Sequence, residues 1–234
     1  MNMPVLFVSL GPGDPELITL KGLKALQQAD VIFCPCTITP SGKQISRAAT
    51  IVKELGIDAA HISLFSLPMS KERTQALLAY DKVYQETLSL QKQDKRIVIV
   101  AEGDAGFYSS VHYIYDKLLN VSIPVEQIAG IPAFIASGAL AGMHIVSQEE
   151  KLLVLPGNVT FTELENYLEA GYVIVIMKLS QCRQAVHRCI VTHPRYTYHY
   201  FENVGTEKEF YTLDIKELQE KEFPYFSLMI LRKE

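Results

Sequence analysis

The sequence predicts an α/β protein made of two α/β domains. Short apolar runs alternate with segments of helical spacing along most of the chain, as expected when strands and helices alternate. Glycine-containing turns follow several of these runs. The C-terminal part differs, because strand-like runs there follow one another with turns between them, which is typical of antiparallel pairing.

The first half predicts a parallel sheet with helices between its strands. The run 5–10 is apolar and ends at a glycine, as buried parallel strands do, and residues 17–29 repeat leucines at helical spacing. Gly56 stands where a glycine closes a helix. The other elements expected in this half are strands at 31–33 and 96–101 and helices at 44–55, 70–93 and 109–119.

The second half continues the alternation and then changes character. Thr160 or Thr162 is expected to start the helix at 162–169, because a threonine side chain can cap a helix N-terminus. The elements predicted here are strands at 125–128, 152–155, 173–177, 196–201, 209–213 and 226–231 and helices at 133–142, 162–169 and 181–190. A helix end and a proline-containing link at 120–124 predict domains at 1–121 and 122–234.

Composition narrows the class of partner. The formal net charge is −4 and the chain lacks a Lys/Arg run, so nucleic acid is not expected as a partner. The longest apolar run, 172–177, is far shorter than a membrane span needs, and the apolar run at 5–10 follows no basic segment, so neither a membrane nor a signal peptide is predicted. The expected location is the cytoplasm. The cysteine spacings do not fit a zinc site, so free thiols and no metal are expected.

Three glycine-containing turns follow predicted strands, at 11–14, 102–104 and 130–132. Ligands of α/β sheets bind beyond the carboxyl ends of the strands, and glycine lets the main chain come close to a ligand. Each turn alone could be no more than a tight turn. Together they predict a cleft lined largely by main chain.

The residues of these turns suit a cationic ligand better than a phosphate. The dinucleotide fingerprint is incomplete, because residue 16 is glutamate where a third glycine is required. Pro12 has no N–H to donate, and Asp14 would repel a phosphate. S-adenosylmethionine carries a sulfonium and an ammonium but no phosphate, so Asp14 and Asp104 fit it.

Three segments resemble the motifs of the tetrapyrrole methylase family. They are 10–21 (LGPGDPELITLK), 102–110 (EGDAGFYSS) and 129–133 (AGIPA), and their order and separation agree with that family from Val5 to Leu231. The resemblance implies a class III S-adenosylmethionine-dependent methyltransferase of two α/β domains, with the active site in the cleft between them. It places the tetrapyrrole on the side of 1–121 and the cofactor on the side of 122–234. It also implies a homodimer.

Site residues follow from the resemblance position by position. It implies cofactor contacts at Glu102, Gly103, Asp104, Phe107, Pro132, Ala133 and Met177. Substrate contacts are implied at Pro12, Asp14 and Tyr108. The sequence names no catalytic residue and no acceptor for a departing proton, since methyl transfer depends mainly on alignment of the two reactants. Lys43, Arg47, Arg73 and Lys178 are candidates to pair with substrate carboxylates, or are ordinary surface charges.

The chain departs from the family pattern at three positions. Ser9 replaces a common glycine, and Ala105 and Ala129 each replace a proline. The family uses these loops to cradle the cofactor through backbone atoms, so cofactor binding is expected to persist. Loss of the two prolines can loosen the loops and lower the affinity.

Three further segments favour one branch of the family, which methylates precorrin-2 or cobalt-factor II at C-20. They are 41–49, 67–70 with the long helix after it, and 151–157. The alternatives are methylation of precorrin-4 at C-11, methylation of uroporphyrinogen III, diphthine synthesis, or a non-catalytic relative that binds the cofactor.

Overall fold

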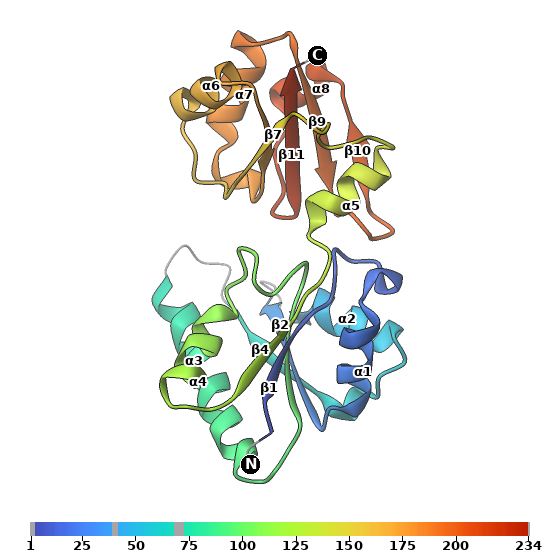
Figure 1. Cartoon of the computed structure of the whole chain (residues 1–234), viewed down its shortest axis with the longest axis vertical. Helices are drawn as coiled ribbons and strands as arrows, with labels where there is room; N and C mark the ends of the chain where they lie inside the picture. Colours follow the sequence, from blue (N-terminus) through green and yellow to red (C-terminus); the bar gives the residue numbers. More distant parts are fainter. Residues whose placement is uncertain (1–2, 39–41, 68–72, 234) are drawn as a thin grey trace. The chain divides into compact units, whose positions relative to one another are not determined.

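The computed structural model describes residues 3–38, 42–67 and 73–233, and the chain divides into two compact units between Pro132 and Ala133 (Figure 1). The boundary predicted after residue 121 therefore needs correction. Strand β6 (Val125–Ile128) pairs in parallel with β1 (Val5–Ser9), so the first unit extends beyond the proline-containing link. Part of the helix predicted at 70–93 and part of the segments 41–49 and 67–70 lie outside the described residues.

The first unit contains the predicted parallel sheet. Its parallel strands lie in the order β4-β2-β5-β1-β6, where β2 is Val31–Ile38, β4 is Ile62–Ser66 and β5 is Ile97–Ala101. The sequence does not predict β4, because its residues ISLFS mix polar and apolar side chains. The short β3 (Gln44–Ile45) pairs antiparallel with the end of β2 and occupies the first residues of the helix predicted from residue 44.

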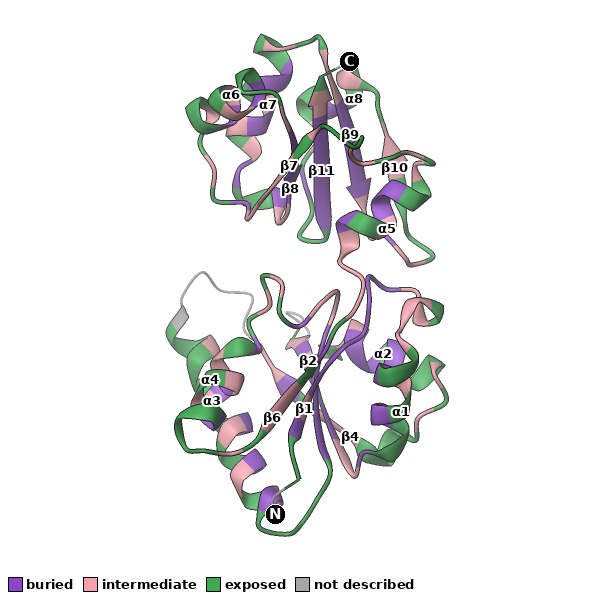
Figure 2. Ribbon diagram, in the orientation of Figure 1, coloured by how far each residue is buried: buried purple, intermediate pink, exposed green. Residues whose placement is uncertain are grey.

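Helices cover both faces of this sheet. They are α1 (Leu20–Gln28), α2 (Arg47–Glu54), α3 (Arg73–Gln91) and α4 (His112–Asn120), with one-turn 3-10 helices at Pro15–Leu17 and Ala59–His61. One buried cluster joins α1 and α2 to the sheet, and a second joins α3 and α4 to its opposite face (Figure 2). Every residue of β5 is buried, because apolar side chains are needed on both sides of a covered sheet. Helix α1 begins later than predicted, since the Thr19 side chain caps it.

The second unit has a mixed sheet in the order β10-β9-β11-β8-β7. Its strands are β7 (Lys151–Leu155), β8 (Tyr172–Ile176), β9 (Tyr196–Glu202), β10 (Phe210–Thr212) and β11 (Ser227–Lys233). Strands β7 and β8 are parallel, whereas β9, β10 and β11 pair antiparallel, which confirms the pattern predicted for the C-terminal part.

The helices of the second unit are α5 (Ala133–Leu140), α6 (Phe161–Glu169), α7 (Arg183–Thr192) and α8 (Ile215–Glu220), with a 3-10 turn at Leu179–Gln181. Helices α6, α7 and α8 share one buried cluster with the sheet. A capping box between Thr160 and Glu163 starts α6, which confirms the first of the two caps considered.

All four cysteines are buried and unpaired, as expected of the chain. Burial raises the pKa of Cys34 to about 12 and the pKa of Cys182 to about 11. Alkylation requires a thiolate, so we expect iodoacetamide at pH 8 to leave both thiols unmodified in the native protein and to modify them in guanidinium. Peptide mass spectrometry of the two samples checks this, and equal labelling in both would contradict it.

Candidate functional site at the ends of β1, β5 and β6

The three glycine-containing turns meet at one edge of the first sheet, as the sequence predicts. Strands β5, β1 and β6 are neighbours in that sheet. The N–H of Gly11 donates to the carbonyl of Gly103 at 3.1 Å, and the N–H of Gly103 donates back at 2.6 Å. The third turn is equally close, because a Cβ added at Gly130 would lie 2.4 Å from the Cβ of Ser9 and 2.8 Å from the Gly103 oxygen. Only glycine fits at residue 130 without displacing these neighbours.

Gly103 presents bare main chain to open space. Its φ is +69°, a left-handed conformation that favours glycine, and a Cβ added there would meet nothing within 4 Å. A ligand can therefore approach the backbone of this turn, which is what a cradle for a nucleoside requires.

Asp104 fastens the turns to one another. One carboxylate oxygen accepts the N–H of Gly106 at 2.8 Å, and the other accepts the N–H of Gly130 at 2.7 Å. The Ser9 hydroxyl lies 3.4 Å from the second oxygen. The carboxylate thus holds the loops in position in addition to placing a negative charge at this edge.

Ser9 and Ala105, two of the departures from the family pattern, are joined by a hydrogen bond. Both residues are buried. The Ser9 hydroxyl donates to the carbonyl of Ile128 at 2.7 Å and accepts the N–H of Ala105 at 2.8 Å. A glycine at residue 9 would have no hydroxyl, and a proline at residue 105 would have no N–H to donate. The structure therefore ties these loops together with a hydrogen bond that a glycine at residue 9 or a proline at residue 105 could not form.

Because the pair acts as a unit, Ser9→Gly and Ala105→Pro should be non-additive. Ser9→Gly leaves the buried N–H of Ala105 without its acceptor, which costs about 1–3 kcal/mol of stability. In the double variant proline has no N–H to leave unpaired, so we expect it to be more stable than the sum of single effects predicts, by about 1 kcal/mol. Urea unfolding of the four proteins measures this coupling, and purely additive costs would rule it out.

Glu102 and Arg47 form an ion pair beside the turns. Glu102 directly follows β5, and Arg47 is the first residue of α2. The Arg47 Nε lies 3.3 Å from the Glu102 Oε2, and the Arg47 guanidinium also donates to the carbonyl of Pro12 at 3.4 Å. Burial raises the pKa of Glu102, and the positive charge of Arg47 opposes that rise. Arg47, one of the candidates to pair with substrate carboxylates, forms this ion pair with Glu102.

The other predicted residues of the first unit lie in the same turns. Asp14 is the N-cap of the 3-10 helix at Pro15–Leu17 and accepts the N–H of Glu16 at 2.8 Å. The rings of Phe107 and Tyr108 are in contact, with centroids 4.7 Å apart. Tyr108 has a φ of +50° and remains 42% exposed. The backbone of a non-glycine residue in this conformation is strained. Residues with such backbone strain cluster at functional sites.

Ala133 and Met177 belong to the second unit. Ala133 is the first residue of α5, and the N–H of Met177 donates to the carbonyl of Leu155 at 2.8 Å. The loops that follow β7 and β8 pass close to each other, since a Cβ added at Gly157 would lie 2.1 Å from the carbonyl oxygen of Lys178. Met177 thus sits where β7 and β8 end, the edge at which ligands of parallel strands bind.

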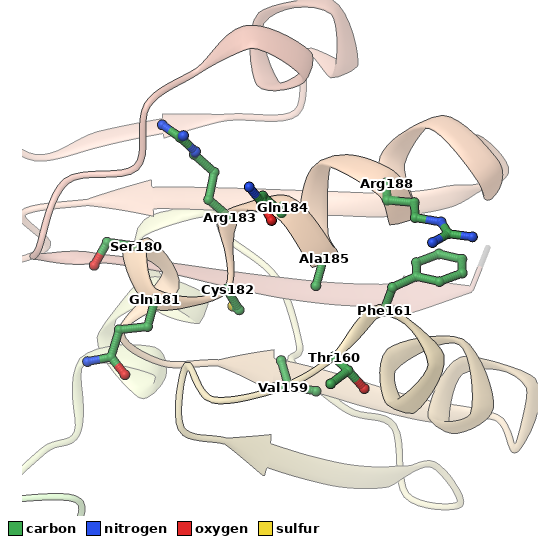
Figure 3. A pocket seen from close by; sticks show the side chains of 10 residues that line it. All are labelled: Val159, Thr160, Phe161, Ser180, Gln181, Cys182, Arg183, Gln184, Ala185 and Arg188. Carbon is green, nitrogen blue, oxygen red and sulfur yellow. The ribbon is translucent and has the colours of Figure 1, made fainter.

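The second unit also contains a hollow of about 600 Å³ that the sequence did not predict (Figure 3). It lies between the loop that starts α6 and the segment that starts α7. The Arg188 guanidinium stacks over the Phe161 ring at 4.2 Å on one side of it. Its lining residues are Val159, Thr160, Phe161, Ser180, Gln181, Cys182, Arg183, Gln184, Ala185 and Arg188, none of which was a predicted site residue.

Across 3–38, 42–67 and 73–233, no group of three or more His, Cys, Asp or Glu side chains is placed to hold a metal ion. No helix within the same ranges has the length and apolar character needed to cross a membrane.

Known proteins resemble this chain in sequence and in fold. It is 30% identical over 232 residues to the precorrin-2 C(20)-methyltransferase of Sinorhizobium sp, covering 96% of this chain and 93% of that protein. It is 32% identical over 171 residues to the probable cobalt-precorrin-2 C(20)-methyltransferase of Methanocaldococcus jannaschii, covering 73% of this chain and 70% of that protein. Uroporphyrin-III C-methyl transferase from Thermus thermophilus, solved with S-adenyl homocysteine, shares the fold with a TM-score of 0.67 at 18% identity, covering 98% of this chain and 92% of that one.

The family follows from these features together. Residues 4–219 match the model of the Tetrapyrrole (Corrin/Porphyrin) Methylases. The chain belongs to this family, and the three motifs that suggested it are the three turns that meet at one edge of the first sheet.

Proposed function

We propose that this protein transfers a methyl group from S-adenosylmethionine to C-20 of precorrin-2, or of its cobalt complex, in cobalamin biosynthesis. One observation carries the proposal: the 30% identity to a precorrin-2 C(20)-methyltransferase extends over 96% of the chain. The meeting of the three family motifs at a main-chain cradle supports it independently.

The donor site is proposed at the turns after β5 and β6. Glu102 and Gly103 would meet the donor through their main chain, beside the open space at Gly103. Asp104 and the bonds it accepts hold this cradle in shape. Phe107, Pro132, Ala133 and Met177 are proposed as further donor contacts. When bound, the donor supplies an electrophilic methyl group on a positively charged sulfur, so the chain has to bind, orient and exclude water rather than activate a nucleophile.

The tetrapyrrole is proposed to contact the Gly11–Asp14 turn and Tyr108. Pro12 is buried with its carbonyl held by Arg47, so this turn has a defined shape. Tyr108 is exposed and could lie against a planar macrocycle. Asp14 is the remaining proposed contact.

The test is methyl transfer under anaerobic conditions. The purified protein is incubated with S-adenosylmethionine, isotopically labelled in its methyl group, and with precorrin-2 or cobalt-precorrin-2 in parallel. We expect the label at C-20 in one or both, read by NMR. Uroporphyrinogen III, precorrin-4 and the diphthamide precursor serve as alternative acceptors, and transfer to one of them alone would replace the proposal. Binding of S-adenosyl homocysteine without transfer to any acceptor would indicate a non-catalytic binder.

We also propose that the protein is a homodimer in the cytoplasm. The resemblance supports the dimer, and the unpaired cysteines are those of a protein kept in a reducing compartment. Light scattering of the purified protein and fractionation of cells that produce it test the two parts separately.

A further inference from the structure

Glu102 is the one acidic side chain among residues 3–38, 42–67 and 73–233 with a buried oxygen that accepts no hydrogen bond. That oxygen, Oε2, lies 3.3 Å from the Nε of Arg47 but accepts nothing from it. A buried carboxylate oxygen left in this state is costly, so its retention calls for an explanation. Asp104, two residues away, has both oxygens engaged.

The surroundings of Glu102 suit a proton acceptor. The side chain as a whole retains 24% of its exposure, although Oε2 itself is buried, so a ligand can reach the side chain. Arg47 favours the ionised form of the carboxylate, whereas burial favours the neutral form and raises its pKa, which makes it a stronger base than an exposed glutamate. Through Arg47 the carboxylate is also joined to the Pro12 turn, which is on the proposed tetrapyrrole side of the site.

The reaction needs such a group. C-20 of precorrin-2 carries one hydrogen. When its carbon forms the new bond to the methyl group, the carbon–sulfur bond breaks with its electron pair going to sulfur, and C-20 then holds both hydrogen and methyl. The C-20–H bond must break next, returning its electron pair to the macrocycle and releasing one proton.

We infer that Glu102 is a catalytic residue, whose carboxylate accepts the proton that C-20 loses. Arg47 is a positioning residue that orients this carboxylate and holds the Pro12 carbonyl. The inference rests on the proposed function for the identity of the acceptor.

Glu102→Gln tests the inference, because it keeps the shape of the side chain and removes the base. We expect methyl transfer to slow by about 100-fold or more while the Kd for S-adenosyl homocysteine, from calorimetry, changes by less than about threefold. A second readout needs no methyl donor. With S-adenosyl homocysteine bound, the wild type should exchange the C-20 hydrogen with D₂O, because the deuterated carboxyl group of Glu102 adds a deuteron to C-20 and its carboxylate then removes the original hydrogen as a proton; Glu102→Gln should not exchange it. Glu54→Gln, an exposed change on α2, is the matched control and should behave as the wild type.

Glu102→Asp keeps a carboxylate and should recover part of both activities even if Glu102→Gln folds poorly. Undiminished transfer and exchange in Glu102→Gln would overturn the inference and leave the proposed function standing. A loss of S-adenosyl homocysteine affinity that matches the loss of rate would also overturn it, by making Glu102 a binding residue. A wild type that neither transfers methyl to precorrin-2 nor exchanges its C-20 hydrogen would overturn the proposed function and this inference together.

Discussion

Gly130→Ala should reduce the affinity for S-adenosyl homocysteine by about tenfold or more, equivalent to about 1.4 kcal/mol. The added Cβ would lie 2.4 Å from the Ser9 Cβ and 2.8 Å from the Gly103 oxygen. Neither neighbour is the far end of a flexible side chain, so the turns must move apart. Such overpacking typically costs about 1–3 kcal/mol of stability. Calorimetry and urea unfolding measure the two effects.

A second substitution separates this clash from other causes. Ser9→Gly removes the Cβ that makes the 2.4 Å contact, so the only contact left under 3.0 Å is that with the Gly103 oxygen. The Ser9→Gly/Gly130→Ala variant should therefore bind S-adenosyl homocysteine more tightly than Gly130→Ala alone. If the double variant bound no better, the contact with Ser9 would not be the reason for the loss.

Among substitutions of single side chains in the three turns, Asp104→Ala should lower the free energy of unfolding most. It removes the acceptor for the N–H groups of Gly106 and Gly130, and leaving such a donor unpaired costs about 1–3 kcal/mol where it is buried. Asp104→Asn retains only one acceptor oxygen, so it should recover part of the stability. We expect both variants to lower the midpoint of urea unfolding, and Asp104→Ala to lower it more than Asp104→Asn.

The charge of Asp104 can be tested apart from its structural role. S-adenosylmethionine carries a positive sulfur that S-adenosyl homocysteine lacks. If the carboxylate attracts that charge, Asp104→Asn should weaken binding of the methylated form more than binding of the demethylated form. Asp14→Ala is the control for stability, since Asp14 caps an exposed 3-10 turn and its loss should cost only about 1 kcal/mol. Equal stability losses for the two variants would contradict the assigned role of Asp104.

Much of the fold could be predicted because its signals are local. The apolar runs at 5–10 and 96–101 became β1 and β5, and Thr160 and Gly56 mark helix ends as expected. The meeting of the three turns was also predictable. Parallel strands place their carboxyl ends at one sheet edge, so motifs that follow parallel strands lie along that edge.

The sequence by itself thus determined the alternation of strands and helices, the family and the edge at which its motifs gather. Only the tertiary structure decided that β6 completes the first sheet, that Ser9 bonds to Ala105, and that Arg47 pairs with Glu102. The physical reason is that these contacts join groups far apart in the chain. Their hydrogen bonds depend on the position of each strand and helix in space, which no local run of residues encodes.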